Sequence, residues 1–406
     1  MTLKKSITLI MCIVLFGCRT GNQTVFDELV LLDANQDKDN IDLLITDIAD
    51  VFYIPLKYGA ENVIVGTTTV GRNIFVYRDI IFLGDDSFAS PKLIAYSFEG
   101  EPIRVFGSFG RGPREYADLK GFIVDTLADE VIIYDQLYGK FVVFSTTGAF
   151  KREELLGRSQ KSFYSTIENM NERYMLAYKD DSLVMSDKDV HAPNGQVYMG
   201  QNSLIARGKV FTLYDKQTLS EVDFSDFEYK KPLRWQIFTI LNNLTTTKYG
   251  VYITSARTDT IYFMDKELRL IPRFVDITKY RDVNHEARLF PSVESEQYII
   301  FSTALENNID NQNLRRYFAY DKKVNKLFRI NTGLPERGVA NPREAIINNR
   351  VAFGQWTLTL NHNYVATFLT PEFLLKHYNS LPANLQKITA KIREDDNPVL
   401  MLMRLK

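Results

Sequence analysis

One short strand-turn pattern recurs along the chain and limits its fold more than any other feature. Five segments place an aromatic residue before a polar turn: "AYSFEGE" from Ala95, "VFSTTGA" from Val143, "TLYDKQT" from Thr212, "YFMDKEL" from Tyr262 and "FAYDKKV" from Phe318. They recur about every 50 residues, with one longer interval of about 70, which is the spacing expected when each repeat is one four-stranded blade. The repeats therefore predict an all-β propeller of six blades, with seven blades as the alternative.

The sequence between the repeats also has the composition of strands. The chain contains 22 Tyr and 27 Phe residues, and aromatic residues are enriched in strands. Short aromatic or β-branched runs such as residues 80–83, 131–134 and 251–254 are bounded by Gly, Asp or Asn. Because no linker rich in Pro, Gly or Ser interrupts the series, we expect residues 51–406 to form a single propeller domain.

The two ends of the chain differ from the repeats. In "TPEFLLKHYNS", Thr370 is a suitable helix cap, Pro371 suits the first helical position and Glu372 suits the first turn. The closing "NPVLMLMRLK" contains an apolar run that predicts a last strand, and "VFYIPLKY" near the N-terminus predicts another. We therefore expect a short helical segment before the closing strand, and strands from both ends that pair in one blade and close the ring.

The first 18 residues resemble a bacterial lipoprotein leader. Two lysines precede the apolar run of residues 7–16, which has about half the length of a membrane-spanning helix and ends in Leu-Phe-Gly-Cys, similar to a lipobox. Phe16 departs from that pattern, which usually has a smaller residue there. The resemblance implies that Cys18 is the lipid attachment site and that residues 19–50 are a tether with the first strand. An ordinary secretory signal with a chance cysteine is the alternative.

Cysteine content and charge limit the location and the partners. Cys12 and Cys18 both lie in the leader, and a body without thiols suits an oxidising compartment. The net charge of -1 argues against a nucleic acid partner, which requires a basic surface. We expect membrane attachment through the lipid alone. Since residues 19–22 contain no acidic run, we expect the outer membrane facing the periplasm, with the cell surface as the alternative.

Several longer segments resemble one protein family. These are "YIPLKY", "FGRGPREY" followed by "GFIVD", "VIIYDQLYGKFVVFSTTGAF" and "EDDNPVLMLMRLK". Together they resemble the six-bladed β-propeller lipoproteins of Gram-negative gut-type bacteria, which are relatives of NHL-repeat propellers. The usual element of that family is Gly-x-Gly-Pro-Gly-Glu-Tyr, and here Arg114 replaces the last glycine. The resemblance implies the fold and an envelope location, but no reaction.

The glycine-rich stretch "FGSFGRGPREYADLK" from Phe106 has two interpretations. Its glycine spacing matches neither a P-loop nor a dinucleotide-binding fingerprint. The first interpretation is a connection between blades in which glycines permit tight turns and Tyr116 packs on a neighbouring blade. In the second, Arg111, Arg114, Glu115 and Tyr116 line the mouth of the central channel and bind a ligand.

Metal ligands and catalytic residues are not identified. Asp33, Asn35 and Asp37 have calcium-loop spacing, but Lys38 stands where Gly is needed and Leu44 where Glu is needed, so a solvated turn is expected. None of the four histidines has zinc-site spacing; they are His191, His285, His362 and His377.

We therefore predict no cofactor and a non-enzymatic binding or scaffolding lipoprotein for a glycan, a peptide or an envelope protein. The alternative is a hydrolase or lyase with a site in the central channel, where a divalent cation would be held as in metal-dependent lactonase propellers. Carboxylates converging with Asn near the axis favour the enzyme, whereas aromatics and arginines favour binding.

Overall fold

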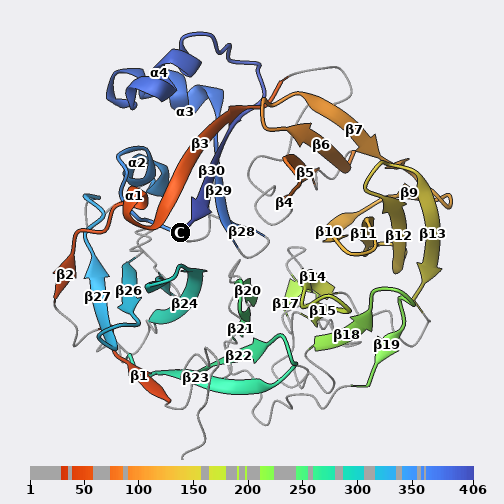
Figure 1. Ribbon diagram of the computed structural model, residues 1–406, viewed down its shortest axis with the longest axis horizontal. Helices are drawn as coiled ribbons and strands as arrows, with labels where there is room; N and C mark the ends of the chain where they lie inside the picture. The colour runs from red at the N-terminus through yellow and green to blue at the C-terminus, as the bar shows by residue number, and fades with distance from the viewer. Residues whose placement is uncertain are drawn as a thin grey trace, which may run out of the picture.

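The computed structural model is a ring of six blades around a central axis (Figure 1). It describes residues 29–34, 39–57, 74–85, 90–156, 164–179, 190–191, 197–198, 211–223, 244–254, 259–278, 287–305, 316–334, 341–353, 358–360 and 363–406. Within these ranges, six sheets of four or five strands surround the axis. The prediction of an all-β propeller with six blades is confirmed.

Blades 1 to 3 are four-stranded antiparallel sheets, and the strands of each blade are given from the axis outward. Blade 1 consists of β4 (Ile74–Tyr77), β5 (Ile80–Asp85), β6 (Lys92–Ser97) and β7 (Pro102–Phe106). Blade 2 consists of β10 (Leu119–Asp125), β11 (Glu130–Asp135), β12 (Lys140–Ser145) and β13 (Phe150–Leu155). Blade 3 consists of β14 (Tyr164–Asn169), β15 (Tyr174–Lys179), β18 (Phe211–Asp215) and β19 (Glu221–Val222).

Blades 4 to 6 each use a strand from the N-terminal part of the chain. Blade 4 consists of β20 (Leu244–Thr246), β21 (Gly250–Ile253), β22 (Thr260–Asp265), β23 (Leu270–Asp276) and the outer β1 (Val30–Leu32). Blade 5 consists of β24 (Ala287–Glu294), β25 (Tyr298–Leu305), β26 (Tyr317–Asp321), β27 (Lys326–Ile330) and the outer β2 (Asn40–Ile41). Blade 6 consists of β28 (Leu358–Leu360), β29 (Tyr364–Leu369), β30 (Val399–Leu405) and β3 (Ala49–Pro55).

Each of the five sequence repeats is the hairpin that joins the third strand of a blade to its fourth strand. They occupy blades 1 to 5 in order. The turns contain residues with positive φ, namely Gly100, Gly148, Leu219, Leu268 and Asn325, which reverse the chain tightly. The longer interval falls in blade 3, where the short pair β16 (Val190–His191) and β17 (Val197–Tyr198) lies between the second and third strands.

The ring closes in blade 6, as predicted. β30 from the C-terminus pairs with β29 on one side and with the N-terminal β3 on the other. The β3 pairing runs from Ala49 opposite Leu405 to Pro55 opposite Val399. Because the last two strands of this blade come from opposite ends of the chain, neither can separate without leaving an open sheet edge.

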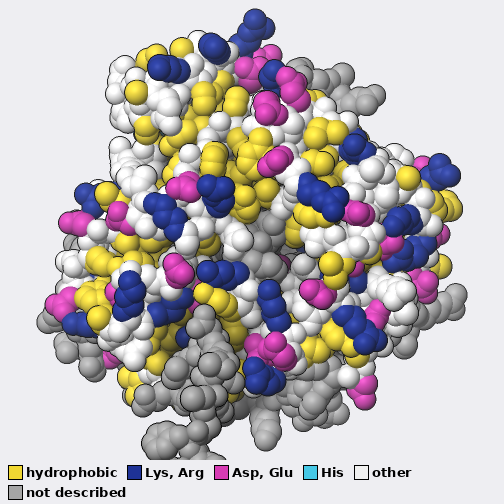
Figure 2. Space-filling model, viewed as in Figure 1, with side chains coloured by type: hydrophobic (Ala, Val, Ile, Leu, Met, Phe, Trp, Pro, Cys, Tyr) yellow, Lys and Arg dark blue, Asp and Glu magenta, His cyan; other side chains and the backbone are white. Residues whose placement is uncertain are grey.

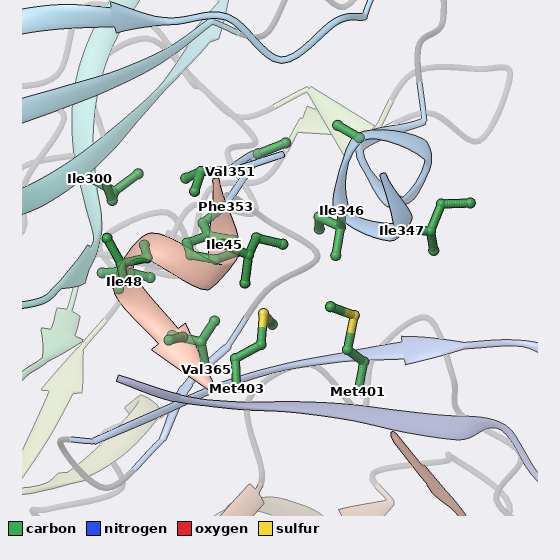
Figure 3. Close-up of a cluster of buried hydrophobic side chains, with 14 of the residues drawn as sticks. Ile45, Ile48, Ile300, Ile346, Ile347, Val351, Phe353, Val365, Met401 and Met403 are labelled. Carbon is green, nitrogen blue, oxygen red and sulfur yellow. The ribbon is translucent and has the colours of Figure 1, made fainter. Parts of the chain in front are cut away.

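The core consists of six clusters of buried side chains, one in each space between neighbouring blades. The cluster between blades 5 and 6 also includes the short helices α1 (Ile45–Ile48) and α2 (Pro342–Ile347). Figure 3 shows Ile45 and Ile48 beside Met403, opposite Ile346 and Ile347. The helices thus contribute to the core between blades 5 and 6.

The predicted C-terminal helical segment is present. It consists of α3 (Pro371–Lys376), a 3-10 turn (Tyr378–Ser380) and α4 (Ala383–Thr389). The Thr370 hydroxyl accepts a hydrogen bond from the Phe373 N–H, which confirms the cap. Figure 1 shows α3 and α4 on the outside of the ring beside blade 6. None of the helices in the described ranges is long and apolar enough to cross a membrane.

Several sequence predictions concern residues outside the described ranges. These are the leader with Cys18, the calcium-like positions Asn35 and Asp37, and two of the histidines, His285 and His362. They stay predictions. His377, which is described, packs its ring against Phe373 with 4.6 Å between the ring centroids.

Candidate functional site

Residues 107–116 form the connection between blade 1 and blade 2, in agreement with the first interpretation of this stretch. Within it, β8 (Ser108–Phe109) pairs in parallel with β9 (Glu115–Tyr116). Figure 1 places β9 over the outer half of blade 2, near β12 and β13. The loop therefore lies toward the rim of the ring.

Tyr116 fixes the loop to blade 1. Its side chain is fully buried, and its hydroxyl donates to the Phe106 carbonyl at 2.8 Å and accepts from the Leu93 N–H at 2.9 Å. Burial raises the pKa of this phenol far above its usual value. The predicted packing of Tyr116 on a neighbouring blade is confirmed, and in this position the side chain offers no surface to a ligand.

Blade 2 holds the other side of the loop. The buried Lys140 ammonium donates to the Gly112 carbonyl at 2.9 Å and to the Glu153 carboxylate at 3.2 Å. The Asp135 carboxylate accepts from the Ala117 N–H at 3.0 Å. With Tyr116 anchored in blade 1, these contacts fix the loop backbone from both blades.

The glycines allow the loop to pack this closely. Gly107 has φ +65°, and a Cβ atom there would lie 2.7 Å from the Arg114 carbonyl oxygen. The Glu115 carboxylate folds back into the loop and accepts from the Gly112 N–H at 2.8 Å. Glu115 therefore serves the loop itself, while the side chains of Arg111 and Arg114 are exposed.

The two arginines each lie beside a half-buried aromatic ring, and apolar side chains of the same loop and of blade 2 are exposed. The Arg111 guanidinium lies 5.6 Å from the centre of the Tyr138 ring, and the Arg114 guanidinium lies at the same distance from the Phe150 ring. Phe109, Leu137 and Leu155 are 54%, 63% and 66% exposed. At the right of Figure 2, around β9 and β13, hydrophobic, basic and acidic side chains are interspersed.

We name this set of residues the Arg111 surface: Phe109, Arg111, Arg114, Leu137, Tyr138 and Leu155. Arginine and aromatic residues are enriched at the centres of protein interfaces, and guanidinium groups bind carboxylates with two parallel hydrogen bonds. The contacts above are with outer strands and the turn between β11 and β12, rather than with the innermost strands. Ligand binding by Arg111, Arg114, Glu115 and Tyr116 stays a prediction.

The innermost strands of blades 3, 4 and 5 are joined by threonine hydroxyls. Thr246 on β20 donates to the Glu168 carboxylate on β14 at 2.8 Å, and Thr245 donates to the Pro291 carbonyl on β24 at 2.7 Å. Among the described residues, no three His, Cys, Asp or Glu side chains are placed to hold a metal ion. The alternative of a hydrolase or lyase site in the channel stays a prediction.

A buried ion pair in blade 5 was not predicted from the sequence. The Lys322 ammonium donates to the buried Glu294 carboxylate at 3.2 Å and to the Ser295 carbonyl at 2.7 Å. Burial lowers the pKa of Lys322, as do the nearby Lys248 and Arg273 charges, although Glu294 opposes the shift.

The Asp-Lys dipeptide of the repeats was the available signal for this pair. The same position in blade 3 is Lys216, whose buried ammonium lies 3.7 Å from the Asp125 carboxylate of blade 2. In both hairpins the lysine that follows the aspartate contacts the last residue of a blade's innermost strand, Glu294 for Lys322 and Asp125 for Lys216. Because both lysines are paired with acidic groups, we assign them a structural role. The Arg111 surface therefore remains the candidate site.

The fold is a single-ring β-propeller, and the Arg111 surface is an exposed patch on a loop held by two blades. The chain belongs to the family described as Domain of unknown function (DUF4934), whose profile matches residues 29–404. No curated protein matches the sequence.

Two solved structures are similar to the chain. A protein from Bacteroides fragilis NCTC 9343 that is described as exported is 14% identical with a TM-score of 0.60, and the alignment covers 93% of this chain and 100% of that one. A member of the DUF4221 family from Bacteroides vulgatus ATCC 8482 is 8% identical with a TM-score of 0.49, covering 88% and 97% of the two chains. At this identity the first likeness supports the fold alone.

Proposed function

We propose that this protein is a lipid-anchored binding or scaffolding module of the cell envelope, and that its partner binds at the Arg111 surface. One observation carries the proposal: exposed guanidinium and apolar side chains lie on a loop whose backbone is fixed from two blades and on the adjoining part of blade 2. A surface that is already ordered loses little conformational entropy on binding. The partner classes that suit it are a glycan, a peptide or an envelope protein.

The envelope location rests on the leader and on the relatives. The lipobox-like Cys18 ends a short apolar run, and a similar propeller from Bacteroides fragilis is described as exported. Replacing Cys18 with Ser should leave a periplasmic protein that no longer fractionates with membranes, because a propeller without its lipid has no other anchor under this proposal. Continued membrane association of the variant would refute the anchor.

Removing both guanidinium groups tests the binding surface. Arg111→Ala combined with Arg114→Ala should abolish binding to envelope glycans, peptides or proteins, while stability changes by less than about 0.5 kcal/mol because both side chains are exposed. Arg173→Ala is the control for binding, since Arg173 is also exposed and lies over an aromatic ring, that of Tyr174, in blade 3. This variant also loses an ion pair with Asp215, so its stability is measured alongside. A ligand that the double variant retains with full affinity would refute the role of the arginines.

A further inference from the structure

Two outer strands of the ring are extended by short strands from the N-terminal part of the chain. β1 joins the outer edge of β23 in parallel, with Val30 opposite Phe274 and Leu32 opposite Asp276. β2 joins the outer edge of β27, also in parallel. Figure 1 shows both segments on the outside of the ring. Fourth strands of this propeller therefore bind extended segments that are remote in sequence.

Other outer strands have no such partner within the described ranges. These are β7, β13, β19 and β3. Open edges are usually protected by short length or by charged side chains. β19 has only two residues, β13 carries Lys151, Glu153 and Glu154, and no large apolar side chain of β3 is strongly exposed. Three of the four edges are therefore poor sites for an added strand.

β7 differs from these three strands. Ile103 is 41% exposed and Val105 is 38% exposed, and they share one face because they alternate along the strand. Arg104 between them points the other way and donates to the Thr147 carbonyl of blade 2. In blade 1, Arg104 of β7 pairs with Ala95, and in blade 2, Arg152 of β13 pairs with Val143 at the equivalent position. Aligned in this way, β13 has the charged Lys151 and Glu153 where β7 has the apolar Ile103 and Val105.

We propose that the outer edge of β7 is a strand-addition site for an extended peptide segment of a partner protein. The segment would run parallel to β7, as β1 and β2 run parallel to their strands. Its alternate side chains would be apolar and would pack on Ile103 and Val105. β1 provides the pattern, because Val30 and Leu32 pack into the core while the intervening Leu31 is exposed.

A peptide fits this edge better than a second copy of the chain. Two β7 strands related by a two-fold axis would pair antiparallel, whereas both strand additions in this ring are parallel. Pro102 lacks an N–H, so the usable edge begins at Ile103 and ends at Phe106. This length suits a short linear segment.

A random library of short linear peptides displayed on phage tests the proposal with the whole protein as bait. Selected peptides should alternate apolar and polar residues. Their dissociation constants should rise about tenfold or more in Ile103→Lys and in Val105→Lys, because a charge on the edge face disfavours strand pairing. Leu31→Lys on β1 is the matched control, since it places a lysine on another exposed outer strand and lies outside the Arg111 surface. Hydrogen exchange in the bound state should slow in residues 103–106.

The outcomes distinguish this edge from the rest of the ring surface. Binding that is unchanged in both lysine variants, or slowed exchange elsewhere in the chain, overturns the proposal, as does a library without enriched peptides. A dimer in solution that Val105→Lys dissociates would assign the edge to a second copy and overturn the peptide assignment. Because Arg111→Ala with Arg114→Ala leaves β7 intact, that variant should bind the selected peptides normally even if the Arg111 surface has no ligand.

Discussion

Replacing Tyr116 with Phe separates the hydroxyl of this residue from its ring. The ring would stay among Phe106, Leu119 and the other buried side chains between blades 1 and 2. Only the two hydrogen bonds of the hydroxyl would be lost, those to the Phe106 carbonyl and from the Leu93 N–H. These two residues lie opposite each other in the pairing of β6 with β7, so the change leaves both backbone groups buried without this partner.

The expected cost follows from that count. A buried backbone group that loses its partner costs about 1–3 kcal/mol, and relaxation of the loop recovers part of it, so the total should be about 2–4 kcal/mol. For a chain of this size the entropy of unfolding converts this loss to a fall in melting temperature of about 2–5 °C.

The assay is a thermal melt of wild type and variant under identical conditions, followed by fluorescence or circular dichroism. Tyr138→Phe is the matched control, because it removes a hydroxyl from a half-exposed tyrosine in the same region. Its melting temperature should change by less than about 1 °C. If Tyr116→Phe melts at the wild-type temperature, the hydroxyl does not hold the loop to blade 1, and the fixed backbone of the Arg111 surface loses its main support.

Three further predictions concern other parts of the ring. Deleting residues 397–406 removes β30 and should abolish soluble expression, because β3 loses its partner strand and β29 loses one of its two. A soluble truncated protein with an unchanged melt would contradict closure through the C-terminus. Gly107→Ala should destabilise the protein more than Gly139→Ala, because both glycines have positive φ but only a Cβ at residue 107 would meet other atoms. Gly139→Ala should cost about 1 kcal/mol of stability, and equal losses of stability in the two variants would refute this argument. For Glu130, burial raises the pKa, but the hydrogen bonds from Arg152 and Lys151 and the charges of these two residues outweigh burial and lower the pKa below 4.5. The stabilisation that ionised Glu130 gives the folded state is therefore complete above pH 4.5. It is lost as the pH falls through the lower folded-state pKa. The melting temperatures of wild type and Glu130→Gln should therefore converge in acid, and a constant difference down to about pH 2 would contradict it.

The sequence predicted the blades because their turns are local. Each repeat joins a third strand to a fourth strand through a few residues, so an aromatic residue before a polar turn is enough to identify it. Blade 6 has no such repeat for a physical reason. Its third strand ends at Leu405 and its fourth begins at Ala49, so no turn joins them. The ends had to be identified instead by their strand-like composition.

Contacts between remote segments could not be predicted in the same way. β1 and β2 are three and two residues long, and each pairs with a strand more than 200 residues away. Short apolar runs do not encode which edge they join. For the site, the glycines indicated a tight connection, and the sequence left Tyr116 with two interpretations, packing on a neighbouring blade or binding a ligand. The neighbours of Arg111 and Arg114 depend on how blade 2 meets the loop.

The three N-terminal strands attach the chain to the ring through pairings of different length. β3 pairs with β30 through seven opposed residues, whereas β1 and β2 contribute three and two. Each pair adds a small increment of stability, so β1 and β2 are the weaker attachments. A force that acts on the chain before residue 29, such as tension from a lipid anchor, would reach β1 in blade 4 first and would have to detach β2 before it reached β3. If the chain is lipid-anchored as proposed, the two strand additions that precede the closing blade would take up tension from the anchor before that blade does.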